Sequence, residues 1–285
     1  MKGATQTLDP IRYYAFLLDA FARYPREGIA IHPYWWRWRR SDRKPAKPLL
    51  RRAARMLRNA SPGDVLEFGV WKGNTINLLA GLLPERELYG FDSFSGFPPD
   101  GRSDWKLDFA LPRLPAVKSN VRLIAGYFED TLPDFVKQRP HDRRVGLLHV
   151  DCDIYSSANT VFRHIGPYLD TETVIVFDEL INYASFVENE FLALYEFLDA
   201  RDLDFRWAIK VGSVIDFAHF CSTRDWDKGF AWFRRQGIYQ NAAIRLAVDR
   251  GREARIDRYR AKAEKLLTLR PMAVPGGQPT DIQPA

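Results

Sequence analysis

The sequence has few cysteines and no long apolar run. Its two cysteines, Cys152 and Cys221, are too few to build a disulfide framework. No apolar stretch approaches the roughly 18 to 20 residues that a membrane-spanning helix needs. The opening residues, MKGATQTLDP, also lack the apolar segment of a secretory signal. These absences exclude a disulfide-stapled scaffold and a transmembrane protein, and we expect a cytoplasmic protein.

The sequence also lacks the G-x-G-x-x-G pattern of a dinucleotide-binding turn, although it contains a related one. Residues 64–77, DVLEFGVWKGNTIN, read as an apolar strand that turns through Gly69 and Gly73 into a helix. Such a turn presents backbone N–H groups and the positive end of a helix dipole to a crevice. With less glycine than a diphosphate requires, it favours a smaller anion such as an amino-acid carboxylate. Similar turns also occur where a strand only packs against a helix. The residues downstream must therefore decide whether this turn binds a ligand.

Positive charge is scarce in the middle of the chain. The net charge is +6, but Lys and Arg outnumber Asp and Glu only in residues 1–60 and 245–270. The segment 32–40, HPYWWRWRR, can bind a nucleic-acid strand or an anionic membrane surface, or it can be a surface arm whose aromatic rings pack on the protein. Because the acidic middle offers no track for a phosphate backbone, we expect no nucleic-acid partner.

Apolar strands and amphipathic helices alternate through the middle of the sequence. Helices near residues 10–21 and 49–57 are followed by strand 65–68, helix 75–83, strand 87–92, strand 121–125, helix 131–138, strand 145–151, helix 158–169, strand 173–178 and helix 186–200. This alternation is typical of right-handed βαβ units that build a parallel sheet with helices on both faces.

The pattern changes after residue 200. Residues 205–211 and 213–220 are β-rich runs on either side of Gly212, which predicts an antiparallel hairpin. Residues 225–236 and 252–266 are predicted helices, and the Pro/Gly-rich end is predicted to be disordered. The predicted organisation is a helical, basic N-terminal extension (1–60), a main α/β domain (61–245), a C-terminal helix (246–270) and a disordered tail (271–285).

Asp92 ends the strand that follows the glycine turn. An acidic residue about 20 residues past the first glycine is placed to accept hydrogen bonds from ribose hydroxyls. A cap for the following loop is the alternative. Together with the turn, Asp92 points to a cofactor that contains a nucleoside.

Further carboxylates end two later strands. Asp151 and Asp153 lie in HVDCDIY, and Asp178 and Glu179 lie in VIVFDEL, one helical crossover further on. Neighbouring parallel strands would bring these carboxylates to one edge of the sheet, where they repel unless a cation neutralises them. Oxygen ligands favour Mg²⁺, whereas caps and ion pairs are the structural alternative. His149 is interpreted as a satisfied core histidine.

Five ordered segments resemble one enzyme family, the S-adenosylmethionine-dependent O-methyltransferases of the macrocin O-methyltransferase type. They are VLEFGVWKGNT, YGFDSFSGFP, GYFEDTLPDF, HVDCDIYSS and VIVFDE, and together they span about residues 62–183. That family methylates sugar hydroxyls on macrolide and aminocoumarin antibiotics. The resemblance implies a Rossmann-like class I methyltransferase fold, α/β, with a mostly parallel seven-stranded sheet in the order 3-2-1-4-5-7-6.

The resemblance also implies roles for individual residues. The cofactor would be bound by Glu67, Gly69 and Gly73 at the methionine end, Asp92 and Ser93 at the ribose, and Gly126, Tyr127, Phe128 and Glu129 around the adenine. Asp151, Asp178 and Glu179 would hold Mg²⁺, and Asp151 and Asp153 would be catalytic, with Asp153 as general base. The family usually has Asp-Asp where this chain has Asp178-Glu179, so the longer side chain leaves the third metal ligand open.

The implied function is a metal-assisted O-methyltransferase that acts on a hydroxyl of a sugar or another small natural product. An RNA methyltransferase using the basic arm and a non-catalytic nucleoside-binding module are the alternatives, and a homo-oligomer stays open. Residues 97–120 form a long connection that, with Trp105 and Phe109, predicts a lid over the acceptor; plain disorder is the other reading.

Overall fold

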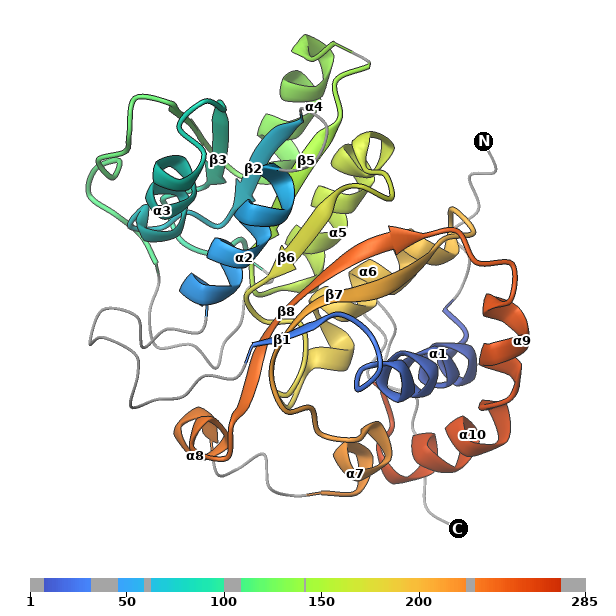
Figure 1. Cartoon of the computed structure of the whole chain (residues 1–285). Coiled ribbons are helices and arrows are strands. Elements are labelled where there is room, and N and C mark those ends of the chain that lie inside the picture. Colours follow the sequence, from blue (N-terminus) through green and yellow to red (C-terminus); the bar gives the residue numbers. More distant parts are fainter. Residues whose placement is uncertain are drawn as a thin grey trace.

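A computed structural model describes residues 8–31, 46–58, 63–99, 109–140, 142–223 and 229–272. Its strands are β1 (Ile29–Ile31), β2 (Asp64–Phe68), β3 (Leu88–Asp92), β4 (Val121–Ala125), β5 (Val145–Val150), β6 (Val174–Phe177), β7 (Asp204–Gly212) and β8 (Ile238–Ala247). The α-helices are α1 (Pro10–Arg23), α2 (Ala46–Arg58), α3 (Asn74–Leu82), α4 (Phe128–Gln138), α5 (Tyr155–Ile165), α6 (Glu190–Asp199), α7 (Phe217–Ser222), α8 (Gly229–Arg235), α9 (Arg252–Asp257) and α10 (Arg260–Leu269). Figure 1 shows how they surround one twisted sheet.

The sheet has the order β1-β7-β8-β6-β5-β2-β3-β4. Strands β2 to β7 correspond to six of the seven predicted strands, and β8, at residues 238–247, takes the place of the seventh. Read from β4 to β7, the order of these seven strands is 3-2-1-4-5-7-6. Only β8 runs antiparallel to its neighbours β6 and β7. The predicted fold class is therefore confirmed. The difference is an eighth strand, β1, which pairs in parallel with β7 at the edge of the sheet.

The predicted hairpin over residues 205–220 is wrong. Strand β7 pairs with β8, not with residues 213–220. The Asp216 carboxylate accepts hydrogen bonds from the backbone N–H groups of Ala218 and His219, and α7 begins there. Phe217 and Phe220, three positions apart, are both buried, so the apolar residues follow a helical spacing rather than a strand spacing.

Two of the predicted helices are interrupted. A 3₁₀ turn, η3 (Phe186–Glu188), comes before α6, where one helix over 186–200 was predicted. The predicted helix over 252–266 is divided into α9 and α10. Helical type was predicted correctly in both segments, but the breaks were missed.

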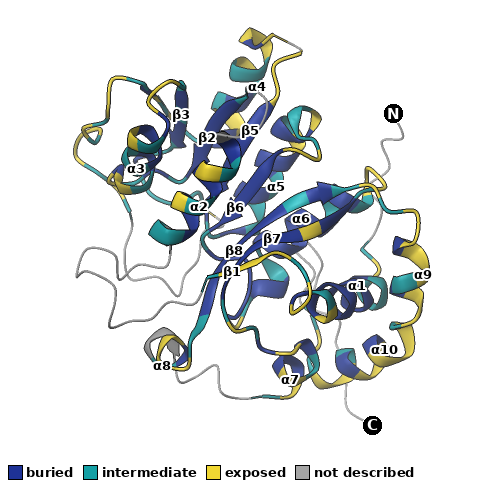
Figure 2. Cartoon of the chain, viewed as in Figure 1, coloured by how far each residue is buried: buried dark blue, intermediate teal, exposed yellow. Residues whose placement is uncertain are grey.

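Both faces of the sheet are covered, and the central strands are buried (Figure 2). All six residues of β5 are buried, as expected of a central parallel strand covered on both sides. One apolar cluster joins the sheet to α1, α4, α5 and α6, and a second joins its other face to α2 and α3. The carboxyl ends of β2, β3, β5 and β6 are held side by side between these layers.

Helix α1 packs beside α9 and α10 (Figure 1). Every residue from 13 to 21 is buried. Arg12 donates to the Glu253 carboxylate at 2.8 Å, and the Nε of Arg255 donates to Asp19 at 3.2 Å. The early and late parts of the chain are thus joined by buried apolar contacts and by ion pairs. The division of the chain at residues 60 and 245 stays a prediction.

Candidate active site

The turn after β2 contains two glycines with left-handed backbone conformations. Gly69 has a φ of 95° and Gly73 a φ of 74°. A Cβ atom on Gly69 would lie 1.7 Å from the backbone carbonyl oxygen of Asp151. The Gly69 N–H donates to the Phe91 carbonyl at 2.9 Å. Glycine is therefore required here, because only a residue without a side chain lets the exits of β2 and β5 meet.

Asp92 braces this turn. One of its carboxylate oxygens accepts hydrogen bonds from the N–H groups of Val70 and Trp71, at 2.8 Å and 2.7 Å, and the other accepts from Phe94 at 2.7 Å. The side chain was predicted to contact a ribose. The structure shows that it ties the loop after β3 to the loop after β2, and the ribose contact stays a prediction.

A cavity of about 460 Å³ lies at the carboxyl ends of these strands, a size that suits one small organic ligand. Its wall contains most of the residues predicted to bind cofactor or metal or to be catalytic: Gly69, Asp92, Ser93, Tyr127, Phe128, Glu129, Asp151, Asp153, Asp178 and Glu179. Glu67, Gly73 and Gly126 do not belong to the wall. Its aromatic part is formed by Trp71, Phe97 and Phe109 among others.

Glu67 is fully buried beneath the cavity. One of its oxygens accepts a hydrogen bond from the Thr75 hydroxyl at 2.8 Å, and the other lies 3.0 Å from Nδ1 of His149. Glu67 and His149 are direct partners on the neighbouring strands β2 and β5. Glu67 therefore anchors α3 and orients the His149 ring, and a direct contact with the cofactor stays a prediction.

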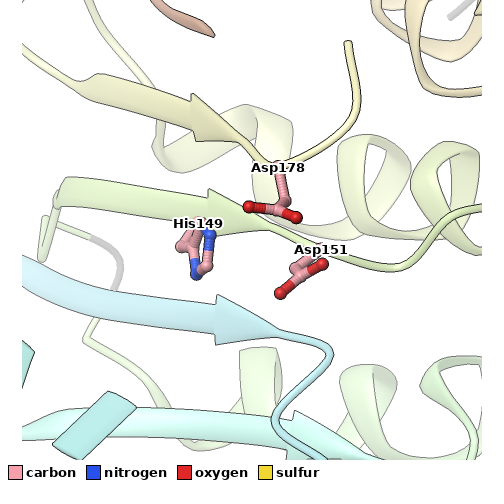
Figure 3. Close-up of side chains that lie close together, drawn as sticks. All are labelled: His149, Asp151 and Asp178. Carbon is pink, nitrogen blue, oxygen red and sulfur yellow. The ribbon is translucent and has the colours of Figure 1, made fainter. Parts of the chain in front are cut away.

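The strand-end carboxylates converge as predicted for neighbouring strands. The N–H of Asp151 donates to the Phe68 carbonyl at 2.8 Å, and the N–H of Asp178 donates to the Val150 carbonyl at 3.1 Å. Figure 3 shows Asp151, Asp178 and His149 grouped at the ends of β5 and β6. One ligand atom from each of the three lies within 4.8 Å of the others, which is close enough for a shared metal ion.

This group differs from the predicted ligand set. In the part of the chain that the structure describes, the compact group consists of His149, Asp151 and Asp178, whereas Glu179 lines the cavity outside it. Asn241 donates to the Asp178 carboxylate at 2.5 Å and fixes its position. His149 was interpreted as satisfied, yet only its Nδ1 has a hydrogen-bond partner among the described residues.

The electrostatics of the site are those of crowded acids. Burial raises the pKa of Asp151 well above its usual value, and the nearby charges of Asp178 and Asp153 raise it further. A cation among these side chains would reverse the effect, because it favours the ionised carboxylates.

Glu190 is a site residue that sequence reasoning missed. Its Oε1 accepts hydrogen bonds from the backbone N–H groups of Cys152 and Asp153, both at 3.2 Å, and the side chain is fully buried. Asp153 has a φ of 65°, an uncommon conformation for a non-glycine residue. Glu190 thus holds the Asp153 loop in place. The only signal in the sequence is a carboxylate at the start of an apolar helix, and nothing there indicates its partner.

The described end of the 97–120 connection packs on the cavity wall. The Phe109 ring meets those of Trp71 and Phe97 edge-on, with both pairs of ring centroids 5.3 Å apart. Asn77 donates to the Ala116 carbonyl and accepts from the Lys118 N–H, both at 2.9 Å, which fastens the returning chain to α3. Trp105 lies outside the described residues, so the lid stays a prediction.

Other predictions also fall outside the described ranges. The basic arm 32–40 and residues 273–285 of the tail are not among them. Within the described ranges, no helix is both long and apolar enough to cross a bilayer.

The central part of the chain matches a known family of domains. Residues 66–180 match the methyltransferase domain family. The match begins in β2 and extends past β6, so it includes the glycine turn, Asp92, Asp151 and Asp178.

Two curated relatives share this part of the chain. The mycinamicin III 3''-O-methyltransferase of Micromonospora griseorubida is 29% identical, over 43% of this chain and 57% of its own length. The demethyldecarbamoylnovobiocin O-methyltransferase of Streptomyces niveus is 28% identical, over 42% of this chain and 54% of its own. The chain thus spans little more than half the length of these relatives. A solved calicheamicin methyltransferase aligns at 22% identity with a TM-score of 0.48, covering 72% of this chain and 90% of that one.

Proposed function

We propose that this chain, whose residues 66–180 match the methyltransferase domain family, transfers a methyl group from S-adenosylmethionine to a hydroxyl of a sugar or another small natural product. The main support is the cavity, whose wall combines Gly69 of the glycine turn with the carboxylates Asp151 and Asp178. The names of the two relatives support the class of acceptor, because one is an O-methyltransferase of mycinamicin III and the other of demethyldecarbamoylnovobiocin.

The residues present fit the cofactor. Gly69 leaves room beside the Asp151 backbone, where a Cβ atom would collide. Gly73 caps α3 without a side chain, so no capping group competes with an anion for the first N–H groups of the helix. A carboxylate such as that of a methionine group suits this position, with the ribose toward Asp92.

The residues present also fit a divalent cation. Asp151 and Asp178 approach each other at a half-buried edge of the sheet, and their charges need compensation. When bound, S-adenosylmethionine supplies a sulfonium methyl group and the cation supplies Lewis acidity to the acceptor hydroxyl. The chain itself supplies alignment and a proton acceptor, a role we assign to Asp153.

Methyl transfer can be measured directly. The protein is incubated with methyl-labelled S-adenosylmethionine and a panel of sugar and phenol acceptors, with and without EDTA. We expect label in a sugar or related small molecule, and none after chelation. Cofactor binding without transfer to any acceptor would instead favour the non-catalytic nucleoside-binding module.

The ribose role of Asp92 can be separated from its bracing role. We expect Asp92→Ala to weaken binding of S-adenosylhomocysteine by roughly 1.5 to 3 kcal/mol, the range for a hydrogen bond to a charged group. Calorimetric titration of S-adenosylhomocysteine and of its 2',3'-dideoxyribose analogue gives the test. A ribose contact requires a large loss for the first ligand and a small one for the second. Equal losses would leave Asp92 only its contacts with Val70 and Trp71.

The alternative RNA methyltransferase makes a different prediction. Replacement of Arg37, Arg39 and Arg40 by Ala should flatten the salt dependence of RNA binding if the arm reads RNA. We expect no specific RNA complex in the unchanged protein, measured by fluorescence anisotropy at physiological salt. A tight, structure-selective complex would contradict the small-molecule proposal.

A further inference from the structure

The His149 side chain has one satisfied ring nitrogen and one orphaned nitrogen. The side chain is only 1% exposed, and the residue lies in the central strand β5. Its Nδ1 lies 3.0 Å from Oε2 of Glu67, whose other oxygen is already occupied by the Thr75 hydroxyl. Because a carboxylate only accepts, this contact places a proton on Nδ1. In a neutral ring, Nε2 then carries the lone pair and can accept a hydrogen bond or bind a metal ion.

Two carboxylates lie close to the His149 ring. Nε2 has no hydrogen-bond partner among the described residues. The ring lies beside Asp151 and Asp178, and one ligand atom of each residue falls within 4.8 Å of the others (Figure 3). A water molecule at their centre could donate to only two of the three, and it would leave the two carboxylate charges uncompensated. A cation satisfies all three at once.

We propose that Nε2 of His149 is the third protein ligand of the cation, beside Asp151 and Asp178, and that Glu179 is not a ligand. The proposal rests on the proposed function only in expecting a cation at this edge. Glu179 lines the cavity outside the compact group of described residues, whereas His149 is fixed within it by Glu67. A carboxylate that holds the far nitrogen of a metal-binding histidine is the usual arrangement in metal sites.

The donor set changes the expected metal. Two carboxylates alone suit Mg²⁺, but an added imidazole nitrogen favours Mn²⁺, Fe²⁺, Co²⁺ or Zn²⁺ over Mg²⁺. Glu67 then acts on the metal through the ring, by fixing its tautomer and raising its basicity. The resident ion is accordingly a transition metal rather than the Mg²⁺ implied by all-oxygen ligands.

Pulsed electron paramagnetic resonance of the Mn²⁺-loaded full chain detects a coordinated nitrogen directly. We expect ¹⁴N modulation in the unchanged protein, its loss in His149→Asn and its retention in Glu179→Gln. Titration with Mn²⁺ should find weaker binding in His149→Asn and nearly unchanged binding in Glu179→Gln. Glu67→Gln should weaken Mn²⁺ binding by about 10- to 100-fold, as substitution of a residue that holds a metal-binding histidine usually does. Magnesium should displace the bound manganese only when present in large excess.

Several outcomes would overturn the inference. They are bound Mn²⁺ without nitrogen modulation in the unchanged protein, modulation that persists in His149→Asn, weaker binding in Glu179→Gln than in His149→Asn, or no binding of Mn²⁺ at all. The signal of the unchanged protein decides the matter even where a variant folds poorly, and circular dichroism checks each fold. Because metal coordination is read without an acceptor, nitrogen coordination without methyl transfer would reject only the proposed function. Transfer with an all-oxygen site would reject only the role of His149.

Discussion

Replacement of Asp178 by Asn is expected to lower the rate of methyl transfer by about 1,000-fold. Lewis-acid catalysis by a bound cation is worth several kcal/mol, and about 4 kcal/mol corresponds to that factor. The substitution preserves the shape of the side chain, and an amide oxygen can still accept the hydrogen bond from Asn241. The loss should therefore come from the metal site rather than from the fold. Turnover of labelled S-adenosylmethionine measures the rate.

Cofactor affinity provides the internal control for this variant. The glycine turn and Asp92 lie at the ends of β2 and β3, whereas Asp178 follows β6, so calorimetry should find the affinity almost unchanged. Asp134→Asn, on the exposed surface of α4, is the matched carboxylate substitution and should retain full activity. An Asp178→Asn variant that is active, together with full activity in EDTA, would show that the acidic cluster is structural.

Substitution of Gly69 by Ala is expected to cost at least about 3 kcal/mol of unfolding free energy and to abolish cofactor binding. A φ of 95° is strained for any residue with a side chain, and the added Cβ would lie 1.7 Å from the Asp151 carbonyl oxygen. Backbone strain and overpacking each cost about 1 to 3 kcal/mol. The turn must move away from β5 to relieve the contact, which displaces Asp151 as well. Urea denaturation and calorimetry measure the two effects.

Gly237→Ala separates the contribution of strain from that of the collision. Gly237 has a φ of 73°, but a Cβ built there meets nothing within 4 Å. We expect it to cost about 1 to 2 kcal/mol, the usual penalty for a left-handed residue with a side chain, and to leave cofactor binding intact. Equal stability of the two alanine variants would mean that the close approach of Gly69 to Asp151 is unimportant.

The central sheet could be predicted because its signals are local. Each buried strand is a short apolar run, and each crossover is a helix with its own apolar face, so alternation alone gives the parallel part. The match of residues 66–180 to the methyltransferase domain family confirms the resemblance on which the strand order was based. The convergence of Asp151 and Asp178 followed from the same topology, because each ends a strand and the two strands are neighbours.

The parts that were missed depend on pairing between distant segments. Residues 213–220 have enough apolar residues for a strand, but Asp216 caps a helix there, and β7 finds its partner at residues 238–247. Strand β1 has only three residues and exists because it extends the edge beside β7. Neither the partner of β7 nor the existence of β1 can be read from the spacing of apolar residues within one segment.

The details of the site were missed for a related reason. The sequence shows His149 in an apolar strand, which is typical of a core histidine, but its orphaned nitrogen depends on how β5 lies in register with Glu67 on β2. Glu67 lies two positions before Gly69, the first residue after β2, and His149 lies two positions before Asp151, the first residue after β5. This equal spacing from the strand ends was the one sign in the sequence that the two side chains are neighbours. Glu190 gave no such signal, because its partners at Cys152 and Asp153 lie 38 and 37 positions earlier.

The pairing of α1 with α9 and α10 also has a consequence for synthesis of the protein. Arg12 and its partner Glu253 are 241 residues apart, so α1 leaves the ribosome long before the surface that covers it exists. At about 5 to 20 residues per second, the delay is on the order of 10 to 50 s. During that time the buried face of α1 lacks its contacts with α9 and α10, which makes the nascent chain a candidate client for chaperones. Docking of α9 and α10 on α1 is therefore a late step of folding, and the central sheet can form before it.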